Sequence, residues 1–156
     1  MRTHLPLAAI CCALLGACAM PFGPKATPPE PLAVPAPSPA LAAPRPRPAA
    51  RTAAEFDTTT PAQRAAAATP ASGGQALGRT IAALGDPTEP GFWVRSPLVR
   101  VAGKGRLVDP ASGTSVQVDL VPLPGDPGAG SQVSLPAFRV LGLPLTALPE
   151  LMVYAD

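Results

Sequence analysis

The sequence predicts a mainly β protein, in which a disordered Pro/Ala-rich tether and a short capped helix precede one small β-rich domain over residues 75–156. Short apolar stretches recur in that domain about every eight to twelve residues, separated by turn residues, which is typical of a small sandwich or barrel. The chain has 24 prolines and 14 glycines among 156 residues, a composition that favours unfolded segments. Aromatic residues make up only 4% of the chain, so the core is expected to be small.

Residues 1–17 have the features of a secretory signal peptide. Arg2 precedes an apolar run over residues 5–15, as in the charged and apolar regions of such signals. The run is shorter than the roughly 20 residues that a transmembrane helix needs. We therefore expect a removable signal and not a permanent membrane span.

The end of this signal resembles the lipobox of bacterial lipoproteins. Gly16 and Ala17 precede Cys18, and the resemblance implies that Cys18 carries the lipid and becomes the new N-terminus. Ordinary signal cleavage is the alternative. Ala19 follows the cysteine, which by the same resemblance favours the periplasmic face of the outer membrane. Several acyl chains would hold the protein firmly to that membrane.

Residues 18–74 are predicted to be a tether. Proline-rich runs at 35–39 and 44–48 favour extended polyproline II, which makes a spacer. The Pro-Arg repeats of the second run could instead be a ligand for an aromatic groove. One helix is expected at about 61–68, because Thr60 and Gln63 form a capping box around Pro61.

The β-rich domain offers several strand candidates. The clearest is 115–120, where Val116, Val118 and Leu120 alternate with polar residues and should face the core. A helix over 135–141 follows, with Ser134 as its N-cap and Gly142 at its end. The other strand candidates are residues 80–84, 92–94, 98–101, 105–108, 132–133 and 151–154.

Two segments carry a family resemblance. Residues 105–118 (GRLVDPASGTSVQV) resemble the strand, turn and strand of the double-psi β-barrel in rare lipoprotein A, and residues 133–142 (VSLPAFRVLG) resemble that family's helix. The resemblance implies a small double-psi-like β-barrel with one short helix and peptidoglycan as its ligand. Residues 83–93 are also similar to small proteobacterial envelope proteins that carry a D-galactarate dehydratase name, although no residue here supports that chemistry.

The chain departs from the active members of the rare lipoprotein A family. Those that act as lytic transglycosylases have an Asp-Arg-Gly-Pro motif after the alternating strand, where this chain has the segment 123–127 (LPGDP). Ser134 also replaces an aspartate at the start of the helix. Asp126 could be a displaced catalytic acid, but its Gly and Pro neighbours favour a turn residue.

The available side chains restrict the chemistry. Residues 75–156 contain no histidine or cysteine, so the usual nucleophile–base pairs and zinc ligands are missing, and we expect no metal and no cofactor. An acid that cleaves glycans needs apolar surroundings that raise the pKa of its carboxyl group. Glu89 is the one acid in this domain that is close to aromatic residues in the sequence. The alternative is that Glu89 lies in a solvated turn. A net charge of +2 argues against a nucleic acid partner.

Trp93 and Arg95 are the candidate ligand-binding residues. If Phe92 and Val94 face the core, alternation turns Trp93 and Arg95 outward, where an indole beside a guanidinium suits stacking on sugar rings. The opposite register buries Trp93. The sequence thus predicts an outer-membrane lipoprotein with a non-catalytic envelope-binding domain. The alternatives are a lytic transglycosylase using Asp126 or Glu89, and a protein–protein adaptor in an envelope complex.

Overall fold

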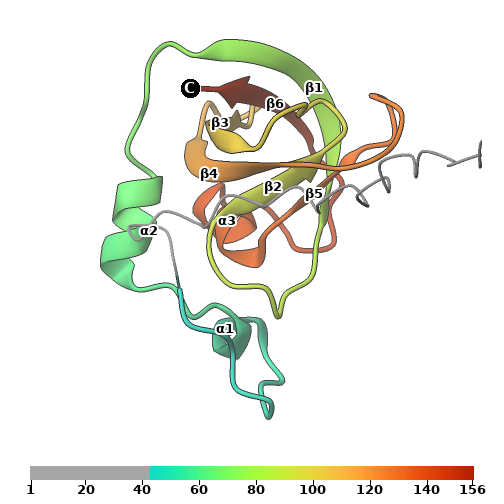
Figure 1. The fold of residues 1–156 in the computed structure, drawn as a ribbon. Helices are drawn as coiled ribbons and strands as arrows, with labels where there is room; N and C mark the ends of the chain where they lie inside the picture. Colours follow the sequence, from blue (N-terminus) through green and yellow to red (C-terminus); the bar gives the residue numbers. More distant parts are fainter. Residues whose placement is uncertain (1–42) are drawn as a thin grey trace, which may run out of the picture. The chain divides into compact units, whose positions relative to one another are not determined.

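The computed structural model describes residues 43–156. The predicted signal peptide, Cys18 and the first part of the predicted tether lie outside the described residues. Six strands close into a barrel in the order β1-β5-β2-β4-β3-β6 (Figure 1). Their bounds are β1 Gln75–Leu84, β2 Trp93–Ser96, β3 Gly103–Val108, β4 Ser115–Pro122, β5 Ser131–Val133 and β6 Glu150–Ala155. The predicted mainly β protein with a small barrel is confirmed.

The barrel repeats one strand topology twice. The pairs β1–β5 and β2–β4 are parallel, and the pairs β1–β6, β2–β5, β3–β4 and β3–β6 are antiparallel. Exchanging β1 with β4, β2 with β5 and β3 with β6 leaves the strand order and every pair direction unchanged. This internal two-fold repeat agrees with the double-psi-like form expected from the resemblance.

The core fills the barrel with aliphatic side chains and two phenylalanines. On β4, Val116, Val118 and Leu120 are buried while the polar residues between them are partly exposed, which confirms the alternation predicted there. The largest fully buried side chains include Phe92 and Phe138. Burial of this apolar surface is the main force that stabilises such a domain.

Helix α3 (Leu135–Val140) packs against β4. Its apolar residues Leu135 and Phe138 are buried. Ser134 occupies the N-cap position, but its side chain makes no hydrogen bond to the helix. The Ser134 hydroxyl accepts instead from the backbone N–H of Trp93 at 3.1 Å. The predicted capping role is therefore replaced by a tie between the helix start and β2.

The predicted strand at 98–101 is wrong. Ser96 turns the chain there, because its hydroxyl accepts from the Leu98 N–H at 3.2 Å and its carbonyl accepts from the Val99 N–H at 3.2 Å. Val101 is 81% exposed and cannot serve as a core position. Strand β1 is longer than the predicted 80–84, because residues from Gln75 onward pair with β6.

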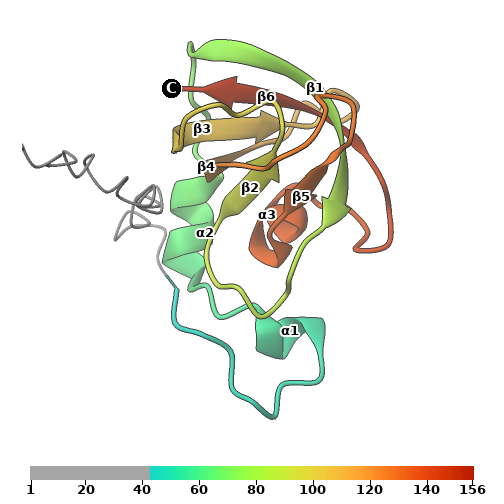
Figure 2. The ribbon, with the colours of Figure 1, turned by 45° about the vertical axis from the view of Figure 1, so that its right-hand side comes forward.

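Two short helices precede the barrel. Helix α2 (Pro61–Ala67) has the predicted capping box, in which the Gln63 N–H donates to the Thr60 hydroxyl at 3.2 Å. Helix α1 (Ala53–Phe56) was not predicted, although Thr52 and Glu55 form the same kind of box. Figure 2 shows α2 alongside the barrel, where it contacts β4 and α3. No helix in the described range is long and apolar enough to cross a membrane.

The described part of the predicted tether packs on the barrel. The Asp57 side chain is fully buried and accepts from the Arg139 guanidinium of α3 at 2.7 Å. Arg64 lies 3.7 Å from the same carboxylate, and Ala67 belongs to the hydrophobic core. Residues 43–74 therefore differ from the free chain that was expected, because ion pairs, an apolar contact and hydrogen bonds from Gln117 to Thr69 and from Arg106 to Gly73 attach them.

Candidate functional site

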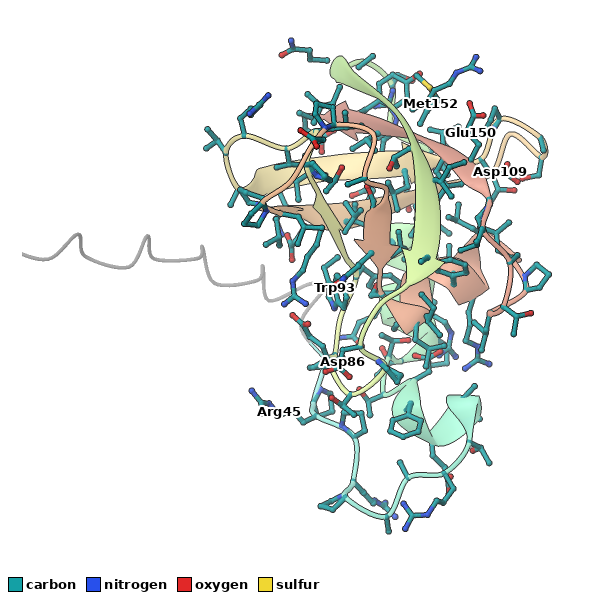
Figure 3. All side chains as sticks on the ribbon, turned by 90° about the vertical axis from the view of Figure 1, so that its right-hand side faces the viewer. Arg45, Asp86, Trp93, Asp109, Glu150 and Met152 are labelled. Atoms are coloured by element: carbon teal, nitrogen blue, oxygen red, sulfur yellow. The ribbon has the colours of Figure 1, made fainter. Side chains whose placement is uncertain are left out.

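The candidate site is a cavity of about 320 Å³ beside strand β2. We call it the Arg95 pocket, and it is lined by Arg45, Asp86, Thr88, Glu89, Pro90 and Arg95. Five of these residues come from β2 and the loop before it, whereas Arg45 comes from the N-terminal segment. Figure 3 shows Arg45 and Asp86 in the lower part of the view with Trp93 above them near the middle, whereas Asp109 and Glu150 lie toward the opposite end.

Glu89 and Arg95 form a two-point ion pair at this pocket. The Arg95 Nη1 lies 2.8 Å from Glu89 Oε2, and Nη2 donates to Oε1 at 2.8 Å. Such fork-to-fork pairs fix the orientation of both planar groups. Both side chains remain about one third exposed, so the pair borders solvent.

A turn at Asp86 positions Glu89. The Asp86 Oδ1 accepts from the Thr88 hydroxyl at 2.7 Å and from the Thr88 N–H at 2.8 Å. These two hydrogen bonds lower the pKa of Asp86 below its ordinary value, with a further contribution from the nearby Arg95. The Glu89 N–H then donates to the Asp86 carbonyl at 3.2 Å, which directs Glu89 toward β2.

Trp93 lies behind the pocket and is only 5% exposed. Phe92 and Val94 are buried as well, because both sides of β2 are covered at this point. The Arg95 guanidinium lies 4.7 Å from the centre of the Trp93 ring, a cation–π distance. The structure therefore corrects the outward indole considered for Trp93, since the ring cannot stack on a sugar as it stands.

The Trp93 indole N–H has no hydrogen-bond partner. Within residues 43–156, Nε1 of Trp93 is the only buried side-chain nitrogen or oxygen without one. Such orphaned donors are rare in folded proteins and often mark functional sites.

The two candidate acids are in different situations. Both oxygens of Glu89 are occupied by Arg95. Asp126 is exposed in the turn between β4 and β5, where its carbonyl accepts from the Ala129 N–H at 2.9 Å. The structure brings Glu89, Trp93 and Arg95 together as the sequence suggested, whereas Asp126 does not line their pocket.

The remaining carboxylates are mostly engaged in structural contacts. Asp119 pairs with Lys104 across β3 and β4, and Glu150 pairs with Arg79 at 3.0 Å. In the described part of the chain, no group of three or more His, Cys, Asp or Glu side chains is placed to hold a metal ion.

Sequence reasoning missed Arg45 as a site residue. The Pro-Arg repeat at residues 44–48 is the sequence feature that could have indicated Arg45, because it carries charged side chains on a conformationally restricted backbone. The sequence does not show, however, that this segment folds back to lie near β2. Comparison with protein-family models, with curated proteins and with solved structures finds no match.

Proposed function

We propose that the protein is a lipid-anchored protein of the outer membrane whose barrel binds peptidoglycan glycan at the Arg95 pocket without cleaving it. The observation that carries this proposal is the Glu89–Arg95 pair stacked on Trp93 at the edge of a polar cavity. Planar charged groups of this kind make charge-assisted hydrogen bonds with defined orientation, and ligand sites use a small number of polar groups placed in this way for specificity.

Binding is favoured over cleavage by the state of the two acids. A general acid must present a proton to the leaving oxygen, and glycosidases hold that acid in an environment that keeps it protonated. Both Glu89 oxygens instead accept from a guanidinium. Asp126 is exposed in its turn and does not line the Arg95 pocket.

Anchoring rests on the lipobox-like residues before Cys18. A lipid at Cys18 would place the barrel in the periplasm, where peptidoglycan is the main glycan. The ligand assignment comes from the resemblance to rare lipoprotein A, and the pocket geometry is compatible with it.

Co-sedimentation with purified peptidoglycan sacculi tests the proposal. The full chain, purified in a neutral detergent, should sediment with sacculi, and Arg95→Gln should weaken this roughly tenfold because a charge-assisted contact is lost. Arg79→Gln is the matched control, since it removes the same charge from an exposed pair with Glu150. Equal binding of sacculi by both variants would show that the ligand does not bind at the Arg95 pocket.

Product analysis of the same samples separates the alternatives. We expect no released muropeptides. Release of anhydro-muropeptides that stops with Glu89→Gln or Asp126→Asn would establish a lytic transglycosylase instead. If the wild-type chain does not sediment with sacculi, glycan binding is wrong and an envelope protein becomes the leading partner.

A further inference from the structure

We propose that the segment at residues 44–58, which we call the arginine loop, is a second binding site that takes a phosphate group through Arg45, Arg47 and Arg51. The cavity of this loop shares Arg45 and Thr88 with the Arg95 pocket, but phosphate binding there does not require glycan binding by the barrel. The proposal rests on a cavity, on the charges that line it and on the way the loop is closed.

The three arginines share one cavity. Its volume is about 340 Å³, and its lining includes Arg45, Arg47, Arg51, Phe56 and Thr88 but no aspartate or glutamate. A concave surface lined only by positive charges raises the local concentration of anions. Phe56 adds an apolar wall, and Thr88 adds a hydroxyl.

Local hydrogen bonds bring these arginines to one place. The Ala50 N–H donates to the Arg47 carbonyl at 3.0 Å, and this turn brings Arg47 and Arg51 to the same cavity. The Thr58 hydroxyl donates to the Pro44 carbonyl at 2.5 Å, which closes the loop. Ala50 is buried at its centre.

Proline restricts the loop before any ligand binds. Pro44, Pro46 and Pro48 alternate with Arg45 and Arg47, and each ring fixes its own φ and limits the residue before it. A segment that is already restricted loses less conformational entropy when its side chains close on a ligand. The arginines are thus carried on a stiff support.

The positive charge of the loop is not neutralised by nearby ion pairs. Among the ion pairs of residues 43–156, none involves Arg45, Arg47 or Arg51. The loop contains two acids, and Asp57 is paired with Arg139 and Arg64. The other acid is Glu55, whose Oε2 accepts from the backbone N–H of Arg51 at 2.8 Å and of Thr52 at 2.9 Å. The Glu55 carboxylate is therefore used to cap α1. Arg51 Nη1 donates to the Ala50 carbonyl at 3.2 Å, and no ion pair among the described residues uses its other donors or the guanidinium groups of Arg45 and Arg47.

Guanidinium forks match phosphate oxygens, which they bind by paired charge-assisted hydrogen bonds. A carboxylate ligand would use fewer of the donors that three arginines provide. Two sources offer the required group: the headgroup of an anionic phospholipid and a free phosphate. The test distinguishes them.

The test titrates the full chain in dodecyl maltoside with three probes, which are inorganic phosphate, dihexanoyl phosphatidylglycerol and dihexanoyl phosphatidylcholine. Arginine side-chain NMR shifts and calorimetry report binding. We expect saturable binding of phosphatidylglycerol or phosphate. The affinity should fall roughly tenfold or more in the Arg47→Gln/Arg51→Gln variant, and it should also fall when salt is added.

The charge-matched control is Arg79→Gln/Arg100→Gln, which leaves the loop intact. Sacculus binding should persist in the loop variant, because neither Arg47 nor Arg51 lines the Arg95 pocket.

Each outcome decides the proposal. Binding of both phosphatidylglycerol and phosphate supports a general phosphate site, and binding of phosphatidylglycerol alone supports a lipid headgroup. The proposal is overturned if none of the probes binds, if phosphatidylcholine binds as well as phosphatidylglycerol, or if the loop variant and the control variant bind equally. Thermal unfolding of both variants shows whether either effect is a loss of folding.

Discussion

The contact between Trp93 and Gly85 shows how single residues shape the Arg95 pocket. A Cβ added at Gly85 would lie 2.4 Å from Cη2 of the Trp93 ring, so the absence of a side chain makes room for the indole. The ring in turn supports the Arg95 guanidinium at 4.7 Å. The orphaned indole N–H costs stability on the order of 1–3 kcal/mol, which is a cost that functional sites often carry.

Gly85→Ala should therefore destabilise the barrel by about 1–3 kcal/mol, because the added methyl group overpacks a filled space. The Trp93 fluorescence maximum should shift to longer wavelength as the ring is displaced toward solvent. Gly103→Ala is the matched control, since nothing lies within 4 Å of a Cβ there. Urea unfolding of both variants checks the prediction, and equal stability would contradict it.

At Cys18, outside the described residues, one substitution tests the anchor. Cys18→Ala should remove membrane association, because one lipid-bearing cysteine is the proposed attachment. Cys11→Ala should leave it unchanged, since that cysteine lies in the predicted signal peptide. Acyl-chain labelling and detergent partitioning measure the outcome. A Cys18→Ala protein that still fractionates with the outer membrane would show that the barrel or another segment binds the membrane.

At the scale of elements, sequence patterns between near neighbours predict helices and strands, whereas interactions between distant residues cannot be predicted from such patterns. The Thr60–Gln63 capping box predicted α2, and the Thr52–Glu55 box would have predicted α1 if the proline-rich stretch had not been treated as tether. The apolar residues at 98–101 suggested a strand, but the Ser96 hydroxyl and carbonyl take the hydrogen bonds that a strand would need. The spacing of apolar residues does not reveal that a side chain competes with a neighbouring strand for backbone hydrogen bonds.

The β3–β4 hairpin depends on Asp109, whose carboxylate holds the turn. Oδ1 accepts from the Ala111 N–H at 3.0 Å and Oδ2 accepts from the Ser112 hydroxyl at 2.7 Å. The Ser112 hydroxyl, with the Ala111 N–H second, lowers the pKa of Asp109 below its ordinary value. A lowered pKa in the folded state adds stability above the unfolded pKa, and this is lost as the pH falls through the folded value.

Asp109→Asn should therefore destabilise the protein at neutral pH, and its difference from wild type should shrink below about pH 4. Urea midpoints measured from pH 7 to pH 2 give the comparison. Asp126→Asn, in an exposed turn, is the control and should show a smaller effect. A difference between Asp109→Asn and wild type that stays constant over the whole range would contradict the role of the charged carboxylate.

At the scale of the whole molecule, the barrel is closed by pairings between distant residues. Alternation predicted the inward face of β4, yet it could not reveal that β6 pairs with both β1 and β3, because strand order depends on contacts across the chain. Glu89, Trp93 and Arg95 were found from the sequence because they are neighbours in it. Arg45 and the buried Asp57 were not, because Arg95, which lines the same pocket as Arg45, and Arg139, which pairs with Asp57, lie far along the chain.

The same long-range contacts predict where the stable unit begins. The Asp57 carboxylate is buried and accepts from Arg139 at 2.7 Å, while Arg64 donates to the Thr59 carbonyl at 2.7 Å. We therefore expect the bond after Arg64, inside α2, to resist trypsin in the folded protein, since cleavage requires local unfolding. The protected fragment should begin before Asp57, and not near Gly74 as the tether interpretation implied.

Asp57→Ala provides the decisive comparison, because it removes the acceptor of Arg139 and leaves the barrel sequence intact. Loss of a buried charge-assisted contact costs about 1.5–3 kcal/mol, which should release α1 and α2 and make the bond after Arg64 cleavable at least tenfold faster. Asp126→Ala controls for loss of a carboxylate, since Asp126 lies exposed in its turn. Mass spectrometry of timed tryptic digests identifies the new N-termini. If the wild-type chain is cut after Arg64 as fast as Asp57→Ala, the ion pair does not hold this segment on the barrel, and the stable domain begins at β1.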